Sequence, residues 1–272
     1  MPVAVGAACA SGQAGVVWWR VILAAVVSLS LQVGVNYAND YSDGVRGTDA
    51  DRVGPLRLVG SGLVVPGQVK RAAVASLVVA CVAGLVLALL TTLWLLVVGL
   101  AAVLAAWFYT GGPRPYGYAG LGEVFVFVFF GLVATVGTTY VLGSALPAES
   151  WWAGAAAGCL SCALLVVNNL RDIPGDTISG KRTLAVRLGD RRTRVLFVTL
   201  FAAAAGFVAA TAATAGGWAL LGLLGLVAAA PAVRGVLAGA AGPALIAVLG
   251  AVGRAQLVFG ATYALGIALA LA

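Results

Sequence analysis

Two clusters of asparagine and aspartate lie at the ends of very apolar stretches. They are Asn36-Tyr-Ala-Asn39-Asp40-Tyr-Ser-Asp43 and Asn168-Asn169-Leu-Arg171-Asp172-Ile-Pro-Gly-Asp176. In each cluster an Asn precedes an Asp by four positions, so a helix would carry the amide and the carboxylate on one face, one turn apart. A carboxylate at membrane depth costs at least ~2.5–3.5 kcal/mol. A chain that places several of them there, twice, is expected to build a cation site.

The spacing of the four carboxylates predicts the kind of cation. Asp40 and Asp43 are three positions apart, and Asp172 and Asp176 are four apart, so each pair can point into one space. Carboxylate and amide oxygens are hard ligands, and the chain has no histidine, which favours Mg²⁺ over softer metals. Mg²⁺ held by few carboxylates leaves positions open for phosphate oxygens, and nearby Arg and Lys side chains would neutralise the rest of a diphosphate. The pattern therefore indicates ionisation of a lipid diphosphate. The alternative is that these carboxylates are solvated loop residues paired with local Arg.

The composition predicts the scaffold that must position these groups. The chain has 272 residues, of which 62% are hydrophobic and 9% charged, and its mean hydropathy is +1.07. Soluble domains carry about 25% charged residues. We therefore expect an all-α, polytopic membrane bundle of eight or nine helices and no separate soluble domain. The apolar spans are 16–38, 68–91, 93–110, 120–143, 151–171, 193–214, 217–233 and 255–272, with a short apolar segment at 1–10 and an ambiguous one at 243–252.

The four cysteines do not indicate redox or metal chemistry. Cys159 and Cys162 have C-x-x-C spacing, but both lie in Ala/Gly/Leu sequence typical of a packed membrane helix. We expect them to act there as small apolar residues.

Positive charge alternates along the chain between successive connections. The connections 39–71 and 172–192 are rich in Arg and Lys, whereas the intervening ones are nearly free of positive charge. By the positive-inside rule the charged connections, and with them both Asp clusters, face the cytoplasm. The net charge of +7 suits anionic lipid and an anionic substrate and gives no evidence for nucleic acid.

Beyond these patterns, long runs of the sequence resemble the UbiA-type intramembrane prenyltransferases, and most closely their 1,4-dihydroxy-2-naphthoate polyprenyltransferase branch. The resemblance covers nearly the whole chain. It is carried by Gln32-Val-Gly-Val-Asn36-Tyr-Ala-Asn39-Asp40-Tyr-Ser-Asp43-Gly-Val-Arg46-Gly-Thr-Asp49, Arg52-Val-Gly54-Pro55-Leu-Arg57, Tyr109-Thr-Gly-Gly-Pro-Arg114-Pro-Tyr116-Gly-Tyr118, Leu121-Gly122-Glu123 and the run from Asn168 through Asp176 and Lys181-Arg182-Thr183 to Gly189.

This resemblance implies a single integral-membrane prenyltransferase domain over 1–272, with helices around a central cavity. It implies that Asp40, Asp43, Asp172 and Asp176 hold Mg²⁺ ions that bridge the diphosphate. The residues it implies for substrate binding are Asn36, Asn39, Arg46, Tyr109, Arg114, Asn168, Arg171, Lys181 and Arg182. Tyr109 and Tyr116 are aromatic side chains that could steady an allylic cation, although each could instead be an interfacial anchor.

The chain departs from the family pattern at two places. Position 47 is Gly where the first motif often has a further Asp, and the nearest acid is Asp49, for which we do not expect a direct metal role. Met1–Ala10 resembles only the end of the family's first helix, so we expect that this helix is truncated or begins upstream of the present numbering.

The implied reaction joins a polyprenyl chain to 1,4-dihydroxy-2-naphthoate with loss of CO₂ and gives demethylmenaquinone, in the bacterial inner membrane with the active site on the cytoplasmic side. No obligate protein partner is evident. One alternative keeps the fold and changes the acceptor to 4-hydroxybenzoate or homogentisate. Another is a transporter, in which intramembrane charges would mark an ion path. Transport predicts acids deep in the bilayer and an inverted repeat, whereas the two clusters lie at the same edge with related spacing.

Overall fold

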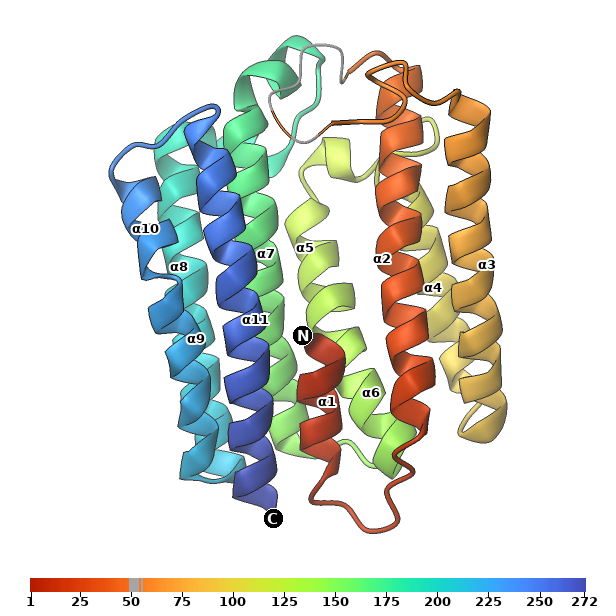
Figure 1. Ribbon diagram of the computed structural model, residues 1–272, viewed down its shortest axis with the longest axis vertical. Coiled ribbons are helices and arrows are strands. Elements are labelled where there is room, and N and C mark those ends of the chain that lie inside the picture. Colours follow the sequence, from red (N-terminus) through yellow and green to blue (C-terminus); the bar gives the residue numbers. More distant parts are fainter. Residues whose placement is uncertain (49–53, 55) are drawn as a thin grey trace. The chain divides into compact units, whose positions relative to one another are not determined.

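The computed structural model describes residues 1–48, 54 and 56–272, and the regular elements in these ranges are helices (Figure 1). No strand occurs in this part of the chain. The predicted all-α class is therefore confirmed. The described chain divides into two compact units, which are treated separately below: a first unit of Met1–Val21, Glu123–Arg171 and Asp190–Ala272, and a second unit of Ile22–Gly122 and Asp172–Gly189.

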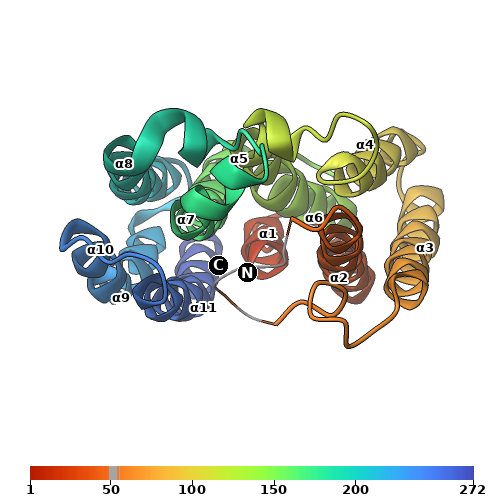
Figure 2. The same ribbon diagram turned by 90° about the horizontal axis from the view of Figure 1, so that it is seen from above.

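The second unit contains both acidic clusters' aspartates. It is formed by most of α2 (Arg20–Val45), by α3 (Pro66–Leu90), α4 (Trp94–Phe108) and the short helix η1 (Gly117–Ala119), and by the facing ends of α7 and α8. Helices α2 and α3 run side by side (Figures 1 and 2), and Gly34 of α2 lies against the Leu77 side chain of α3. At 26 residues, α2 is about 39 Å long, which exceeds the ~30 Å hydrocarbon core. This length lets its last turns, which carry Asp40 and Asp43, reach the polar edge.

The first unit contains the remaining helices. These are α1 (Pro2–Ala10), α5 (Gly122–Val126), the π-helical turn η2 (Phe127–Val133), α6 (Ala134–Gly143), α7 (Ala148–Ile178), α8 (Leu184–Ala215), η3 (Gly217–Gly222), α9 (Leu223–Ala228), α10 (Ala230–Leu237) and α11 (Ala244–Leu271). Helix α1 packs against α6 and α11, and the Thr139 hydroxyl donates to the Gly6 carbonyl at 2.9 Å. Where α5–η2 passes α7, Gly131 and Gly158 come so close that a Cβ on Gly131 would lie 2.4 Å from the Gly158 Cα.

Six described helices are long and apolar enough to cross a membrane, or seven if the bent pair Gly217–Ala228 and Ala230–Leu237 is one span. A further apolar helix, α4, is shorter. Each predicted span coincides with one of these helices, and the ambiguous segment 243–252 belongs to α11.

The predicted ends of two spans were wrong. Helix α2 continues to Val45 rather than residue 38, and α7 continues through Pro174 to Ile178 rather than ending at residue 171. Hydropathy falls where charged residues begin, but the backbone hydrogen bonds of a helix do not depend on apolar side chains. As a result, all four candidate aspartates lie on helices rather than in loops.

Candidate active site

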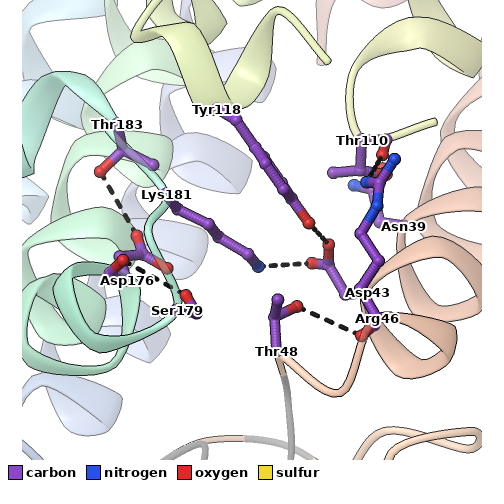
Figure 3. Close-up of polar contacts among 10 residues, drawn as sticks. All are labelled: Asn39, Asp43, Arg46, Thr48, Thr110, Tyr118, Asp176, Ser179, Lys181 and Thr183. Atoms are coloured by element: carbon purple, nitrogen blue, oxygen red, sulfur yellow. Dashed lines mark hydrogen bonds and ion pairs between the residues drawn. The ribbon is translucent and has the colours of Figure 1, made fainter. Parts of the chain in front are cut away.

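Asp43 lies at the centre of the polar contacts in the second unit (Figure 3). Its carboxylate is buried near the end of α2, with 6% of the residue exposed. The Lys181 Nζ lies 3.0 Å from Asp43 Oδ2, and the Tyr118 hydroxyl donates to Asp43 Oδ1 at 2.5 Å. These two contacts join three segments that are far apart in the sequence.

Lys181 connects the first acidic motif with the second. Besides its ion pair with Asp43, its ammonium group interacts electrostatically with Asp176, which in turn interacts with Asp172. Burial opposes the charge on Lys181, but Asp43 and Asp176 outweigh this effect and raise the pKa of Lys181 above its ordinary value. Lys181 therefore carries its positive charge between carboxylates of both motifs.

The turn between α7 and α8 holds Lys181 in place. The Lys181 amide donates to the Asp176 carbonyl at 2.8 Å, and the Ser179 hydroxyl donates to the same carbonyl at 3.2 Å. The Thr183 hydroxyl donates to Asp176 Oδ2 at 3.3 Å and accepts from the Val186 amide at 3.4 Å, so that it caps the start of α8. The second motif and Lys181 are thus fixed by one short, hydrogen-bonded turn.

Tyr118 is positioned by the segment that follows α4. The Arg182 amide donates to the Tyr118 carbonyl at 3.0 Å, which ties this segment to the α7–α8 turn. Gly120 ends η1 with φ +77°, and a Cβ there would lie 3.0 Å from the Arg187 Nε, so glycine suits both the turn and the close approach. Burial raises the pKa of Tyr118 and the Asp43 carboxylate raises it further, so its phenol keeps the proton that it donates.

Arg46 and Asn39 hold the chain at the end of α4. The Arg46 guanidinium donates to the carbonyls of Thr110 and Gly112, and the Thr110 hydroxyl donates to Asn39 Oδ1 at 2.9 Å (Figure 3). Arg46 also lies over one aromatic ring, that of Tyr118, at 5.2 Å, and Lys181 lies over the same ring at 5.0 Å. Tyr118 therefore organises two cations beside Asp43.

Asp40 has different partners from Asp43. It is buried, and its two carboxylate oxygens accept hydrogen bonds from the backbone amides of Leu58 and Val59 at 2.9 and 3.1 Å. One helical turn earlier, the Asn36 amide donates to the carbonyl of Gln32 in its own helix at 2.7 Å. In this structure Asp40 anchors the connection between α2 and α3.

The other predicted site residues are spread over both units. In the second unit, the Tyr109 ring packs edge-on against Tyr116 at 5.5 Å, and Arg114 and Arg182 are exposed. In the first unit, Arg171 donates to Asn168 Oδ1 at 2.9 Å. Asp49, Arg52 and Pro55 lie outside the described residues. Hence the structure brings Asn39, Asp43, Arg46, Asp172, Asp176 and Lys181 together.

The donor set around Lys181 suits a hard cation. Asp43, Asp172 and Asp176 supply carboxylate oxygens, which are ligands that Mg²⁺ prefers. Asp43 and Asp176 interact with the Lys181 ammonium, and Asp172 interacts with Asp176. Within the described ranges, no three acidic or cysteine side chains are close enough together to form a metal site by themselves. By their chemistry these carboxylates fit a divalent cation, and in this structure Lys181 is the cation between Asp43 and Asp176.

Two residues of this site were not predicted from the sequence. The sequence singles out Tyr109 and Tyr116 as aromatic candidates, with Tyr118 only as part of the same run. In the structure Tyr118 contacts Asp43, and the Tyr116 hydroxyl donates to the Ala105 carbonyl at 2.8 Å. Thr183 received no role. Its position one residue before a helix start is a capping signal that could have indicated it, whereas no spacing rule separates Tyr118 from its neighbours.

The apolar helices and the family of related sequences place this chain among membrane-embedded transferases. The chain belongs to the UbiA prenyltransferase family, which it matches over residues 1–239. Membership in a prenyltransferase family removes the basis for the transporter alternative.

Two proteins of known name are similar to this chain over most of its length. The 1,4-dihydroxy-2-naphthoate octaprenyltransferase of Mycobacterium tuberculosis is 53% identical over 227 residues, covering 82% of this chain and 76% of that protein. The Escherichia coli protein of the same name is 39% identical over 191 residues, covering 65% of this chain and 62% of that protein.

Solved structures show the same fold. A UbiA homolog from Aeropyrum pernix K1 superposes with a TM-score of 0.68 at 18% identity, covering 99% of this chain and 94% of the other. A UbiA homolog from Archaeoglobus fulgidus bound to GPP and Mg²⁺ gives a TM-score of 0.60 at 15% identity, with 98% and 94% covered. At these identities the likeness shows the fold alone.

Proposed function

We propose that this chain transfers a polyprenyl group from a polyprenyl diphosphate to 1,4-dihydroxy-2-naphthoate, with loss of the ring carboxylate as CO₂. The observation that carries the proposal is the buried cation Lys181 between Asp43 of the first acidic motif and Asp176 of the second, with Asp172 beside Asp176. The naphthoate acceptor is supported by the names of the Mycobacterium tuberculosis and Escherichia coli relatives.

We propose these carboxylates, together with Asp40 of the first motif, as the residues that would hold Mg²⁺. The Archaeoglobus fulgidus homolog was solved with GPP and Mg²⁺, which supports use of this ion in the family. When bound, Mg²⁺ would supply positive charge to the phosphate oxygens of the leaving group.

The chain's own cations act on the same leaving group. Lys181 can exchange its contact with Asp43 for a phosphate oxygen, because a lysine ammonium is a compact, mobile charge on a flexible stem. Arg46 stays fixed by the backbone carbonyls of Thr110 and Gly112 and adds a second positive charge beside the same tyrosine ring. These side chains favour departure of the diphosphate because they stabilise charge that develops on it.

The remaining steps follow from the two substrates. The allylic C–O bond breaks, both electrons leave with the diphosphate, and the electron-rich ring carbon that bears the carboxylate forms the new C–C bond. The carboxylate then leaves as CO₂ and returns its bonding electrons to the ring, so the product is the dihydroxy, reduced form of demethylmenaquinone. The chain has no histidine, and a carboxylate or the released diphosphate therefore has to take up any hydroxyl proton.

The acceptor is the part of this proposal that a direct assay tests first. Membranes that contain the protein are incubated with a labelled polyprenyl diphosphate and, separately, with 1,4-dihydroxy-2-naphthoate, 4-hydroxybenzoate or homogentisate. We expect a labelled lipid product with the naphthoate. Product formed only with 4-hydroxybenzoate would move the chain to a different acceptor class.

The role of Lys181 gives a second prediction. Lys181→Gln should raise the KM for polyprenyl diphosphate about 10-fold or more, in line with the loss of one hydrogen bond to a charged group, and should leave the KM for the acceptor nearly unchanged. Lys70→Gln is the matched control, because Lys70 also lies over a tyrosine ring, that of Tyr41, at 5.5 Å but is exposed. Equal kinetics of the Lys181 variant and the control would exclude Lys181 from diphosphate binding.

We place the protein in the bacterial plasma membrane with this site on the cytoplasmic side. Its apolar helices make it a multi-pass membrane protein. The side is supported by the basic residues that flank both acidic motifs, including Arg46, Arg182 and Arg187, under the positive-inside rule.

A further inference from the structure

Glu123, in the first unit, is a half-buried acid that the steps above do not use. It lies in the first turn of α5, and α7 holds it at two points. The Asn169 amide donates to Glu123 Oε1 at 3.0 Å, and the Cys162 thiol donates to the Glu123 carbonyl at 3.1 Å. The side chain and the backbone of Glu123 are thus both fixed.

The second carboxylate oxygen of Glu123 has no such contact. Glu123 Oε2 is buried, and no hydrogen-bond donor in the described part of the chain reaches it. A buried polar atom without a partner is unfavourable by about 1–3 kcal/mol, and more for a charged group, so such atoms are few in native proteins. An oxygen that is held in a fixed position and left without a donor is suited to receive one from a ligand.

The surroundings of Glu123 favour an aromatic ligand. The segment that follows Glu123 carries Phe127 one helical turn later on the same face. A Cβ on Gly158 of α7 would lie 2.8 Å from the Phe127 ring, so this aromatic side chain lies on the α7 side, as Glu123 does. The segment continues into the π-helical turn Phe127–Val133, and π-helical turns are frequent at functional sites. A carboxylate repels a diphosphate but accepts hydrogen bonds from hydroxyl groups. Of the two proposed substrates, only the naphthoate carries hydroxyl groups.

We propose that Glu123 Oε2 accepts a hydrogen bond from a ring hydroxyl of the aromatic acceptor, with Asn169 as the positioning residue that holds the carboxylate. This inference rests on the proposed function, because it concerns the acceptor of that reaction. It assigns Glu123 to the choice and orientation of the acceptor and not to the diphosphate.

The variant Glu123→Gln tests this assignment with little change of shape. The glutamine oxygen can still accept from Asn169, but an NH₂ donor replaces Oε2. We expect the KM for the naphthoate to rise about 10-fold or more, while the KM for polyprenyl diphosphate and the melting temperature in detergent stay near the wild-type values. Glu149→Gln is the control, because it makes the same substitution at a glutamate in the first turn of another helix of the first unit, α7; it should keep the wild-type KM for the naphthoate.

Inhibitors that lack one hydroxyl provide a second test of the contact. 1-Hydroxy-2-naphthoate and 4-hydroxy-2-naphthoate should inhibit the wild-type protein with Ki values about 10-fold or more apart, and Glu123→Gln should abolish that difference. Equal Ki values for the wild-type protein, or an unchanged difference in the variant, would overturn the inference.

Different results would refute the proposed function and the proposed role of Glu123. A wild-type protein that does not prenylate the naphthoate refutes the proposed function. If it prenylates 4-hydroxybenzoate instead, Glu123→Gln should raise the KM for that phenol, and an unchanged KM would refute the role of Glu123 as well.

Discussion

Asp43→Asn is expected to lower kcat/KM about 10²–10³-fold, a loss comparable to removal of one strong electrostatic stabiliser. Asp43 is the acid on which Lys181 and Tyr118 converge, so its charge determines how the cations of the site are held. Asparagine keeps the size of the side chain and an oxygen for Tyr118 but removes the negative charge. The loss should therefore appear in turnover, while the detergent-solubilised protein remains folded.

Asp190→Asn is the control for this substitution. Asp190 also forms an ion pair, with Arg194 at 2.7 Å, but its side chain is 61% exposed. Exposed ion pairs contribute little, and this variant should keep its kcat/KM within about 2-fold. Similar activities of the two variants would show that Asp43 has no special role in the reaction.

Removal of divalent cations is expected to have the second large effect. Activity in the presence of excess EDTA should fall about 10²-fold or more and return when Mg²⁺ is added in excess over the chelator. Ca²⁺ should restore much less, because Mg²⁺ requires a smaller, more regular arrangement of oxygen ligands. The measurement is the initial rate of prenyl transfer in chelator-treated membranes, and an undiminished rate there would exclude a metal-dependent mechanism.

The sequence was sufficient to predict the helical class and the approximate positions of the apolar spans. Apolar runs of about 20 residues with charged connections allow little else in a bilayer. The expected helical setting of both motifs is confirmed, because Asp43 lies in α2 and Asp176 lies in α7. These features depend on residues close together in the chain, so they can be predicted from a single sequence.

The different surroundings of Asp40 and Asp43 could not be predicted in the same way. Both aspartates have the same type, lie in the same motif and are buried, yet Asp40 binds the backbone amides of Leu58 and Val59 whereas Asp43 meets Lys181. These partners come from distant segments, so only the tertiary structure assigns them. The partner of Tyr118 could not be predicted either. Tyr109, Tyr116 and Tyr118 are the same residue type in one short segment, and only the tertiary structure shows that Tyr118 is the one that contacts Asp43.

Glu123 shows a further limit of sequence patterns. An isolated acid at the start of an apolar helix is also typical of a helix N-terminus, where a negative charge is favourable. Only the burial of its Oε2 and the contact of Oε1 with Asn169 distinguish it from that ordinary role.

The central claim is transfer of the prenyl group to a naphthoate that loses its carboxylate, and a doubly labelled assay tests it most directly. 1,4-Dihydroxy-2-naphthoate labelled in the carboxyl group is supplied with a polyprenyl diphosphate that carries a different label, and CO₂ and lipid product are followed together. We expect carboxyl label to be released as CO₂ in equal amount to the prenylated product. Prenylated product that retains the carboxyl label, or no transfer to the naphthoate at all, would contradict the proposed function.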